Sequence, residues 1–136
     1  MSKIIMISMP VTDLPRSVAF YEALGFTKSP QFAGNTMACM IWSEAIQIIL
    51  LTHEVWRGLT TRPIPPSTSS EMGLALTFDS RDAVDAAHAA AVAHGGTPDI
   101  NPVEDEVFMY ARDFTDPDGH VWGAKWFDMA AKPTAA

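Results

Sequence analysis

The hydrophobic pattern divides the chain into two similar series of short elements. In the first series, the apolar run Lys3–Met9 predicts a strand. Apolar residues then recur at helical spacing between Asp13, a typical N-cap, and Gly25, a typical helix stop. Apolar runs separated by turn residues predict three further strands at Phe26–Ser29, Asn35–Trp42 and Ile46–Thr52.

The second series repeats this order. Gly73–Phe78 predicts a strand, and an alanine-rich helix is expected from a cap at Asp79 or Ser80 to Ala93. The remaining strands are predicted at Pro98–Ile100, Val107–Phe114 and His120–Phe127, the last two joined by the turn 116–119. Two βαβββ modules of this kind give an α+β fold, because one module alone leaves a face of its sheet uncovered.

Between the modules, residues His53–Glu71 have a different composition. Three prolines and a Ser/Thr cluster make a regular element unexpected there, so we predict a linker. A lid is the alternative, since Trp56 and Arg57 lie on the segment. The expected organisation is a single domain over 1–128, with module 1 at 1–52, the linker at 53–71, module 2 at 72–128 and a flexible tail at 129–136.

Composition narrows the class of protein. The chain has 136 residues and a formal charge of −7, without a Lys/Arg cluster, which argues against a nucleic-acid partner. The apolar N-terminal run is short, and no run reaches the roughly 18 apolar residues of a membrane span, so no membrane partner is expected. The single cysteine, Cys39, excludes an intrachain disulfide and suits a reducing compartment, so we expect a cytoplasmic protein and a buried, structural thiol.

Two motifs together resemble one family. Val11-x-Asp13-Leu14-x-x-Ser17-x-x-Phe20-Tyr21-x-x-x-Gly25-Phe26 and the late Asp116-Pro-Asp-Gly119-His120 are similar to the vicinal oxygen chelate superfamily. This superfamily contains glyoxalase I, bleomycin-resistance proteins, extradiol dioxygenases and small lactoylglutathione-lyase-like proteins. The resemblance covers roughly residues 3–128. It implies paired βαβββ modules that form a cupped mixed sheet around a cavity, often in a homodimer.

The resemblance also implies four inward-facing metal ligands in active members. Carried over one by one, the first position falls on Met6 and the second on Leu50. The third falls on Gly73, and the fourth, seven residues after the first Asp of the late motif, falls on Gly123. A thioether is a soft donor and the other three side chains offer none, so the resemblance leads us to expect no metal and no other cofactor. A shift of two residues at the third position reaches Glu71, which is outside the predicted strand.

Strand alternation extends these positions to a predicted pocket. Ser8 shares the face of Met6, Ala75 that of Gly73, and Lys125 that of Gly123. Lys125 is then either a polar group on the cavity wall or a lysine at its rim. The complete predicted pocket, with four aromatic candidates for its walls, is Met6, Ser8, Leu50, Gly73, Ala75, Gly123, Lys125, Trp42, Trp56, Phe108 and Tyr110.

Three functions remain open on these grounds. The first is metal-free binding of a small aromatic or amphipathic molecule in the sheet cavity, similar to bleomycin-resistance proteins. The second is a lyase- or isomerase-type enzyme without the usual metal, using His53 with Glu54, or Lys125, as acid and base. The third is a metalloenzyme with displaced ligands, for example His53, Glu54 and His120.

Overall fold

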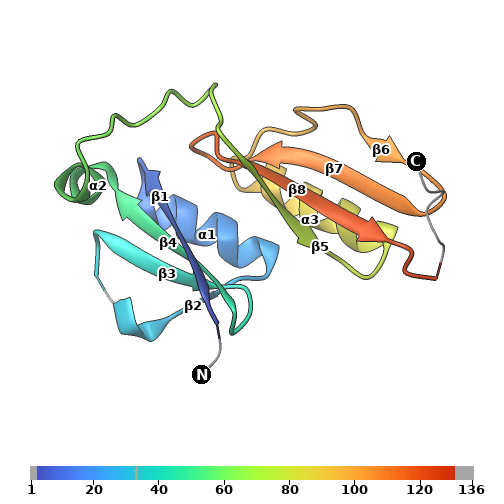
Figure 1. Cartoon of the computed structure of the whole chain (residues 1–136), viewed down its shortest axis with the longest axis horizontal. Helices are drawn as coiled ribbons and strands as arrows, with labels where there is room; N and C mark the ends of the chain where they lie inside the picture. Colours follow the sequence, from blue (N-terminus) through green and yellow to red (C-terminus); the bar gives the residue numbers. More distant parts are fainter. Residues whose placement is uncertain (1–2, 33, 131–136) are drawn as a thin grey trace. The chain divides into compact units, whose positions relative to one another are not determined.

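The computed structural model describes residues 3–32 and 34–130, and the chain divides into two compact units, Met1–Pro66 and Ser67–Ala136 (Figure 1). Each unit contains one four-stranded sheet. The two βαβββ modules and the α+β class expected from the sequence are confirmed. From residue 131 onward, the predicted tail lies outside the described residues.

Unit 1 has a mixed sheet in the order β1-β4-β3-β2. Strand β1 pairs in parallel with β4, while β3 pairs antiparallel with β4 and β2. In chain order the elements are β1 (Ile5–Val11), α1 (Leu14–Leu24), β2 (Thr27–Lys28), a short 3₁₀ turn η1 (Pro30–Phe32), β3 (Met37–Ile41), β4 (Ile46–Thr52) and α2 (His53–Leu59).

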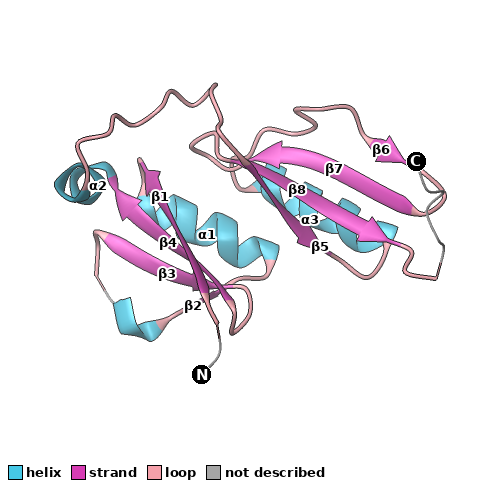
Figure 2. Cartoon of the chain, in the orientation of Figure 1, coloured by secondary structure: helices cyan, strands magenta, loops and turns pink. Residues whose placement is uncertain are grey.

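Helix α1 begins and ends where its sequence signals predict. The Asp13 carboxylate accepts a hydrogen bond of 3.1 Å from the Arg16 backbone N–H, which satisfies one of the free donors of the first turn. Gly25 ends the helix at φ 113°, a conformation that side chains with a Cβ disfavour. Phe20 and Tyr21 are fully buried, so α1 is held mainly by packing on one face of the sheet (Figure 2).

Helix α2 corrects the expectation that residues 53–71 contain no regular element. The Thr52 hydroxyl accepts from the Val55 N–H, and the backbone is helical through Leu59. The prolines that argued against regular structure all follow the helix, at positions 63–66. The apolar residues Val55 and Trp56 pack against the sheet, which stabilises a helix too short to persist alone.

Unit 2 repeats the topology with the sheet order β5-β8-β7-β6. Its elements are β5 (Gly73–Thr77), α3 (Arg81–Ala93), β6 (Glu104–Asp105), β7 (Met109–Thr115) and β8 (Val121–Phe127). Figure 2 shows α3 lying across one face of this sheet. Ser80, one of the two predicted caps, accepts from the Ala83 N–H.

One predicted strand of unit 2 is wrong. Residues Pro98–Ile100 form only an isolated bridge, between Pro98 and Phe114, and the edge strand is β6 instead. Asp99 leaves the extended conformation at φ 44° and donates its N–H to His88 instead of to β7, which explains why no regular ladder forms there. The longest described helix, α3, has 13 residues, and none of the helices in the described ranges combines the length and apolarity of a membrane crossing.

Candidate functional site

In unit 1, one face of the sheet lies against α1 and the other faces away from it. The Tyr21 hydroxyl of α1 donates to the Met9 sulfur at 3.6 Å, which places Met9 on the α1 side. Met6 and Ser8 therefore point to the opposite side, which we call the distal face of unit 1. Leu50 pairs with Met9 across β1 and β4, so the structure does not bring Leu50 to the face of Met6.

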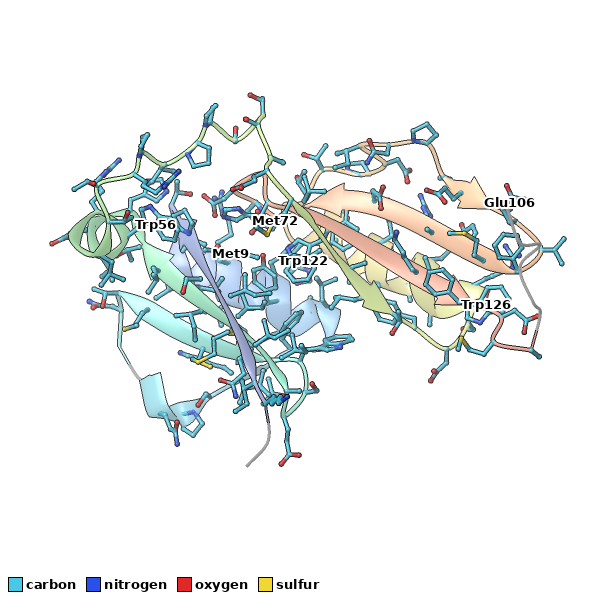
Figure 3. All side chains as sticks on the ribbon, in the orientation of Figure 1. Met9, Trp56, Met72, Glu106, Trp122 and Trp126 are labelled. Atoms are coloured by element: carbon cyan, nitrogen blue, oxygen red, sulfur yellow. The ribbon has the colours of Figure 1, made fainter. Side chains whose placement is uncertain are left out.

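The distal face of unit 1 is apolar, and α2 packs on part of it. Its buried centre is Cys39, Ile49 and Leu51, with Met37, Ile41, Val55 and Trp56 packed around them. Trp56 extends from α2 toward this sheet (Figure 3), and its buried indole N–H has no hydrogen-bond partner within the described ranges. The Cys39 thiol is buried as predicted, and burial raises its pKa, so it stays protonated and unreactive at neutral pH.

In unit 2, contacts with α3 identify the covered face in the same way. Tyr110 of β7 donates its hydroxyl to Asp85 of α3 at 2.7 Å. Strand residues that are one position away from Tyr110, such as Ala111, point to the opposite side of the sheet, which we call the distal face of unit 2. The strand registers place Gly123 on it between Ala75 of β5 and Asp113 of β7, with Lys125 two residues along β8.

A cavity of about 410 Å³ lies on this distal face. That volume is within the range of small-molecule sites, which is roughly 300–1,000 Å³. Small residues form its floor and both apolar and polar groups form its walls. The cavity is lined by Ser70, Glu71, Met72, Gly73, Leu74, Ala75, Asn101, Asp113, Val121, Trp122, Gly123 and Lys125.

Asp113 is one of the cavity residues that the sequence analysis missed. Its Oδ2 atom accepts a hydrogen bond of 2.9 Å from the Asn101 side-chain amide. The available signal was the hairpin: the turn at 116–119 sets a register in which Thr115 pairs with Val121 and Asp113 with Gly123. Extending this register back along β7 would have put a carboxylate beside the fourth carried-over position.

The α3-covered side of unit 2 holds a second charged cluster, which is internally satisfied. The Arg112 guanidinium donates to Asp85 at 3.0 Å and to Asp99 at 2.9 Å. The hydrogen bonds from Tyr110 and Arg112 lower the pKa of Asp85, and those from Arg112 lower the pKa of Asp99. His88 is buried, which together with the Arg112 charge lowers its pKa, so its neutral ring accepts from the Asp99 N–H at 3.2 Å.

The Asp116–His120 turn borders the cavity region. The buried Asp116 carboxylate accepts from the N–H groups of Asp118 and His120, both at 2.9 Å. Gly119 has φ 91°, and a Cβ built on it would lie 2.1 Å from the carbonyl oxygen of Ser67. The chain at Ser67 therefore crosses this turn in direct contact with its backbone, three residues before Ser70 enters the cavity wall.

Of the predicted pocket residues, the structure brings Gly73, Ala75, Gly123 and Lys125 into one cavity. Met6 and Ser8 lie on the distal face of unit 1, and Trp56 lies on α2 beside that face. The others lie elsewhere: Leu50 packs toward α1, Trp42 contacts Phe26 with ring centroids 5.1 Å apart, Tyr110 faces α3, and Phe108 precedes β7 outside the cavity lining.

His53 and Glu54, the predicted acid–base pair, are the first two residues of α2. His53 is half-buried and Glu54 is exposed. Among the described residues, no hydrogen bond or ion pair joins their side chains. Lys125, the third candidate, belongs to unit 2 and lines the cavity described above.

The donor set does not fit the metal of the resembled family. Met6 offers a thioether, Gly73 and Gly123 offer no side chain, and Leu50 points toward α1. Within residues 3–32 and 34–130, no three His, Cys, Asp or Glu side chains are grouped so that they could hold a metal ion. The nearest carboxylates in the cavity are Glu71 and Asp113, and two oxygen donors fall short of the usual set.

Comparison with known proteins identifies the family. The model of the glyoxalase/bleomycin resistance protein/dioxygenase superfamily matches residues 3–123, so the chain belongs to this superfamily. No curated protein sequence matches the chain.

Solved structures agree on the fold. A glyoxalase/bleomycin resistance protein/dioxygenase family enzyme from Burkholderia phytofirmans PsJN superposes with a TM-score of 0.77 at 18% identity, covering 93% of this chain and 99% of the other. A glyoxalase/bleomycin resistance protein from Albidiferax ferrireducens T118 gives 0.66 at 26% identity, covering 89% and 95%. TnmS3, an antibiotic binding protein from Streptomyces sp. CB03234, gives 0.61 at 24% identity, covering 93% and 97%.

Proposed function

We propose that this protein binds a small aromatic or amphipathic molecule in the cavity on the distal face of unit 2, without a metal ion. The observation that supports this most directly is the floor of that cavity. Gly73, Ala75 and Gly123 lie side by side on β5 and β8, where larger side chains would fill the space. Met72 and Val121 add apolar wall, while Asp113, Asn101 and Lys125 supply a few polar groups, the usual composition of a ligand site.

Binding is favoured over turnover by the arrangement of the candidate acid–base groups. His53 and Glu54 lie in α2 of unit 1 and make no hydrogen bond to one another, so neither orients the other for proton transfer. TnmS3, an antibiotic binding protein, shares the fold, which is consistent with a binding role.

The test is a titration with two aromatic dyes of opposite charge, 8-anilinonaphthalene-1-sulfonate and proflavine, on protein whose metal content has been measured by mass spectrometry. We expect at least one dye to bind one site per chain in protein that holds less than stoichiometric metal. Ala75→Leu places a larger side chain on the cavity floor, in the space that the dye would occupy. It should therefore weaken binding of that dye about tenfold or more. The matched control, Ala86→Leu, makes the same change at an exposed position of α3 and should leave binding unchanged.

Two outcomes contradict the proposal. One is a stoichiometric divalent ion whose removal abolishes dye binding, because the site would then depend on metal. The other is dye binding that is equal in wild type and Ala75→Leu, because the dye would then occupy another surface.

We also propose a homodimer in the cytoplasm. β1 is an edge strand of its sheet, and Ile5 and Met6 on it are 57% and 55% exposed, an apolar edge of the kind that a second chain can cover. Mass measured by light scattering during gel filtration tests the dimer, and a monomer at micromolar concentration would contradict it.

A further inference from the structure

Gly123 creates a gap that Asp113 occupies. A Cβ built on Gly123 would lie 2.7 Å from the Asp113 Oδ1 atom, closer than real Cβ atoms come to a neighbouring atom. The carboxylate of Asp113 therefore extends over the backbone of β8 instead of pointing past a side chain. With Oδ2 held by Asn101 at 2.9 Å, the carboxylate has a fixed direction, and Oδ1 remains an acceptor without a donor among the described residues.

Lys125 reaches the same place from two residues along β8. Its Cε atom would lie 3.4 Å from the same Cβ position on Gly123. An acceptor oxygen and the stem of an ammonium group thus flank a single point on the cavity floor, yet they form no ion pair with each other. Within the part of the chain that is described, the Lys125 ammonium has no hydrogen-bond partner, so both charged groups are available to a third molecule.

The remaining charges of this sheet do not compete for these groups. Arg112, next to Asp113 in the sequence, points to the other face and is bound by Asp85 and Asp99. The cavity lining contains one further charge, Glu71, which precedes β5. Besides Glu71, the charged groups of this face are the Asp113 carboxylate and the Lys125 ammonium, which flank the Gly123 position on a floor of small residues.

We propose that Asp113 and Lys125 determine the specificity of this cavity by binding a polar end that carries an N–H donor next to an oxygen acceptor, as in an amide or an α-amino acid. This inference rests on the proposed binding function and names the chemistry of its ligand. The donor binds Asp113 Oδ1 and the oxygen accepts from the Lys125 ammonium, while the aromatic part lies on Ala75 and the neighbouring apolar wall. Hydrogen bonds to charged groups are stronger than neutral ones, so a group that engages both side chains gains affinity over one that engages either alone.

The experiment uses four small probes with the same ring: L-phenylalanine and benzamide, which carry both groups, and benzylamine and benzoate, which carry one each. Binding is followed by the amide shifts of Gly123 and Ala75 in ¹⁵N NMR spectra. We expect at least one of the first two to bind about tenfold more tightly than both of the others, the ratio for one extra charged hydrogen bond. Preference for L-phenylalanine indicates a zwitterionic ligand, and preference for benzamide indicates a neutral amide.

Variants assign the effect to the two side chains. Asp113→Asn and Lys125→Met should each weaken binding of the preferred probe about tenfold, because each substitution removes one charged hydrogen-bond partner. Asp82→Asn on α3 and Lys28→Met on β2 remove the same charges at exposed positions and should change nothing. Four results would overturn the inference. With the wild type these are equal affinity for all four probes, tighter binding of a one-group probe, or no shift with any probe. With the variants it is unchanged binding in both Asp113→Asn and Lys125→Met.

The two proposals fail separately. If a dye binds in a manner sensitive to Ala75→Leu while the probe preference is absent, the cavity binds ligands but Asp113 and Lys125 do not select them. If no dye binds the cavity, the proposed function itself is wrong.

Discussion

Gly119→Ala is a direct test of the contact between the Asp116–His120 turn and the chain at Ser67. Two separate effects act at this position. The backbone has φ 91°, which L-residues with a Cβ disfavour, and the added Cβ would lie 2.1 Å from the Ser67 carbonyl oxygen. That neighbour is backbone and not the end of a flexible side chain, so the chain at Ser67 must move.

The expected loss can be worked out from these two effects. The left-handed conformation costs an alanine roughly 1–2 kcal/mol. Overpacking against a fixed neighbour adds about 1–3 kcal/mol. The lower entropy of the unfolded alanine chain offsets about 0.4–1 kcal/mol. The free energy of unfolding should therefore fall by about 1–5 kcal/mol, with a central value of about 3. For a chain of this length each kcal/mol lowers the melting temperature by about 4 °C.

Gly95→Ala isolates the first effect. Gly95 has φ 97°, but the nearest atom to its added Cβ is Pro117 Cγ at 3.5 Å, an ordinary contact. The Gly95→Ala variant should lose about 1 kcal/mol of unfolding free energy. This is the cost of the left-handed conformation minus the gain from the lower entropy of the unfolded chain. Gly73→Ala, which has neither feature and meets Val121 at 3.5 Å, gives the baseline. Melting curves followed by circular dichroism measure all three variants, and equal losses in Gly119→Ala and Gly95→Ala would refute the contact with Ser67.

Three further predictions concern other parts of the molecule. Thr52→Ala removes the cap of α2 and should lower the free energy of unfolding by about 1 kcal/mol, measured by urea unfolding, whereas Thr52→Ser should retain it. Trp56→Phe removes a buried N–H that has no partner among the described residues, and this offsets part of the packing lost with the smaller ring, so the expected loss in the same assay is under about 1 kcal/mol and a larger loss would contradict this reasoning. Because the pKa of His88 is lowered in the fold, the unfolded chain binds more protons just below its ordinary pKa of about 6.5, and stability should decrease as pH falls from 7 to 5; His88→Gln should reduce this slope, and an unchanged slope would contradict the role of His88.

The sequence predicted the elements whose signals are local. Helix α1 was bounded correctly because Asp13 and Gly25 act through hydrogen bonds and backbone conformation within the helix itself. Helix α2 was missed because the segment was judged as a whole by its prolines, although the stabilising contacts of Val55 and Trp56 are with a sheet that the sequence does not display. Local signals therefore predicted most of the elements, whereas α2 depends on tertiary contacts.

Cavity residues were predicted only on strands where one position of known facing fixed the alternation of the others. On β8 the resemblance put the fourth carried-over position at Gly123, seven residues after Asp116, and alternation from it placed Lys125 on the same face. Both residues line the cavity of unit 2, as does Ala75. On β4 the run Ile48–Leu51 is apolar at every position and buried on both faces, so nothing in it revealed which face Leu50 occupies. Asp113 was missed because its importance comes from a neighbouring strand, where Gly123 leaves room for it.

The packing of α2 onto one sheet makes the two copies of the module unequal. Both have the same strand order and the same kind of distal face, yet a helix with Val55 and Trp56 lies on the first, while the second bears an open cavity. Substitutions on the first face must satisfy a packed core, whereas those around Gly123 need only avoid clashes. A duplicated topology can thus keep one copy constrained by folding while the other tolerates more substitutions, so we expect sequence differences among relatives to concentrate on β5, β7 and β8.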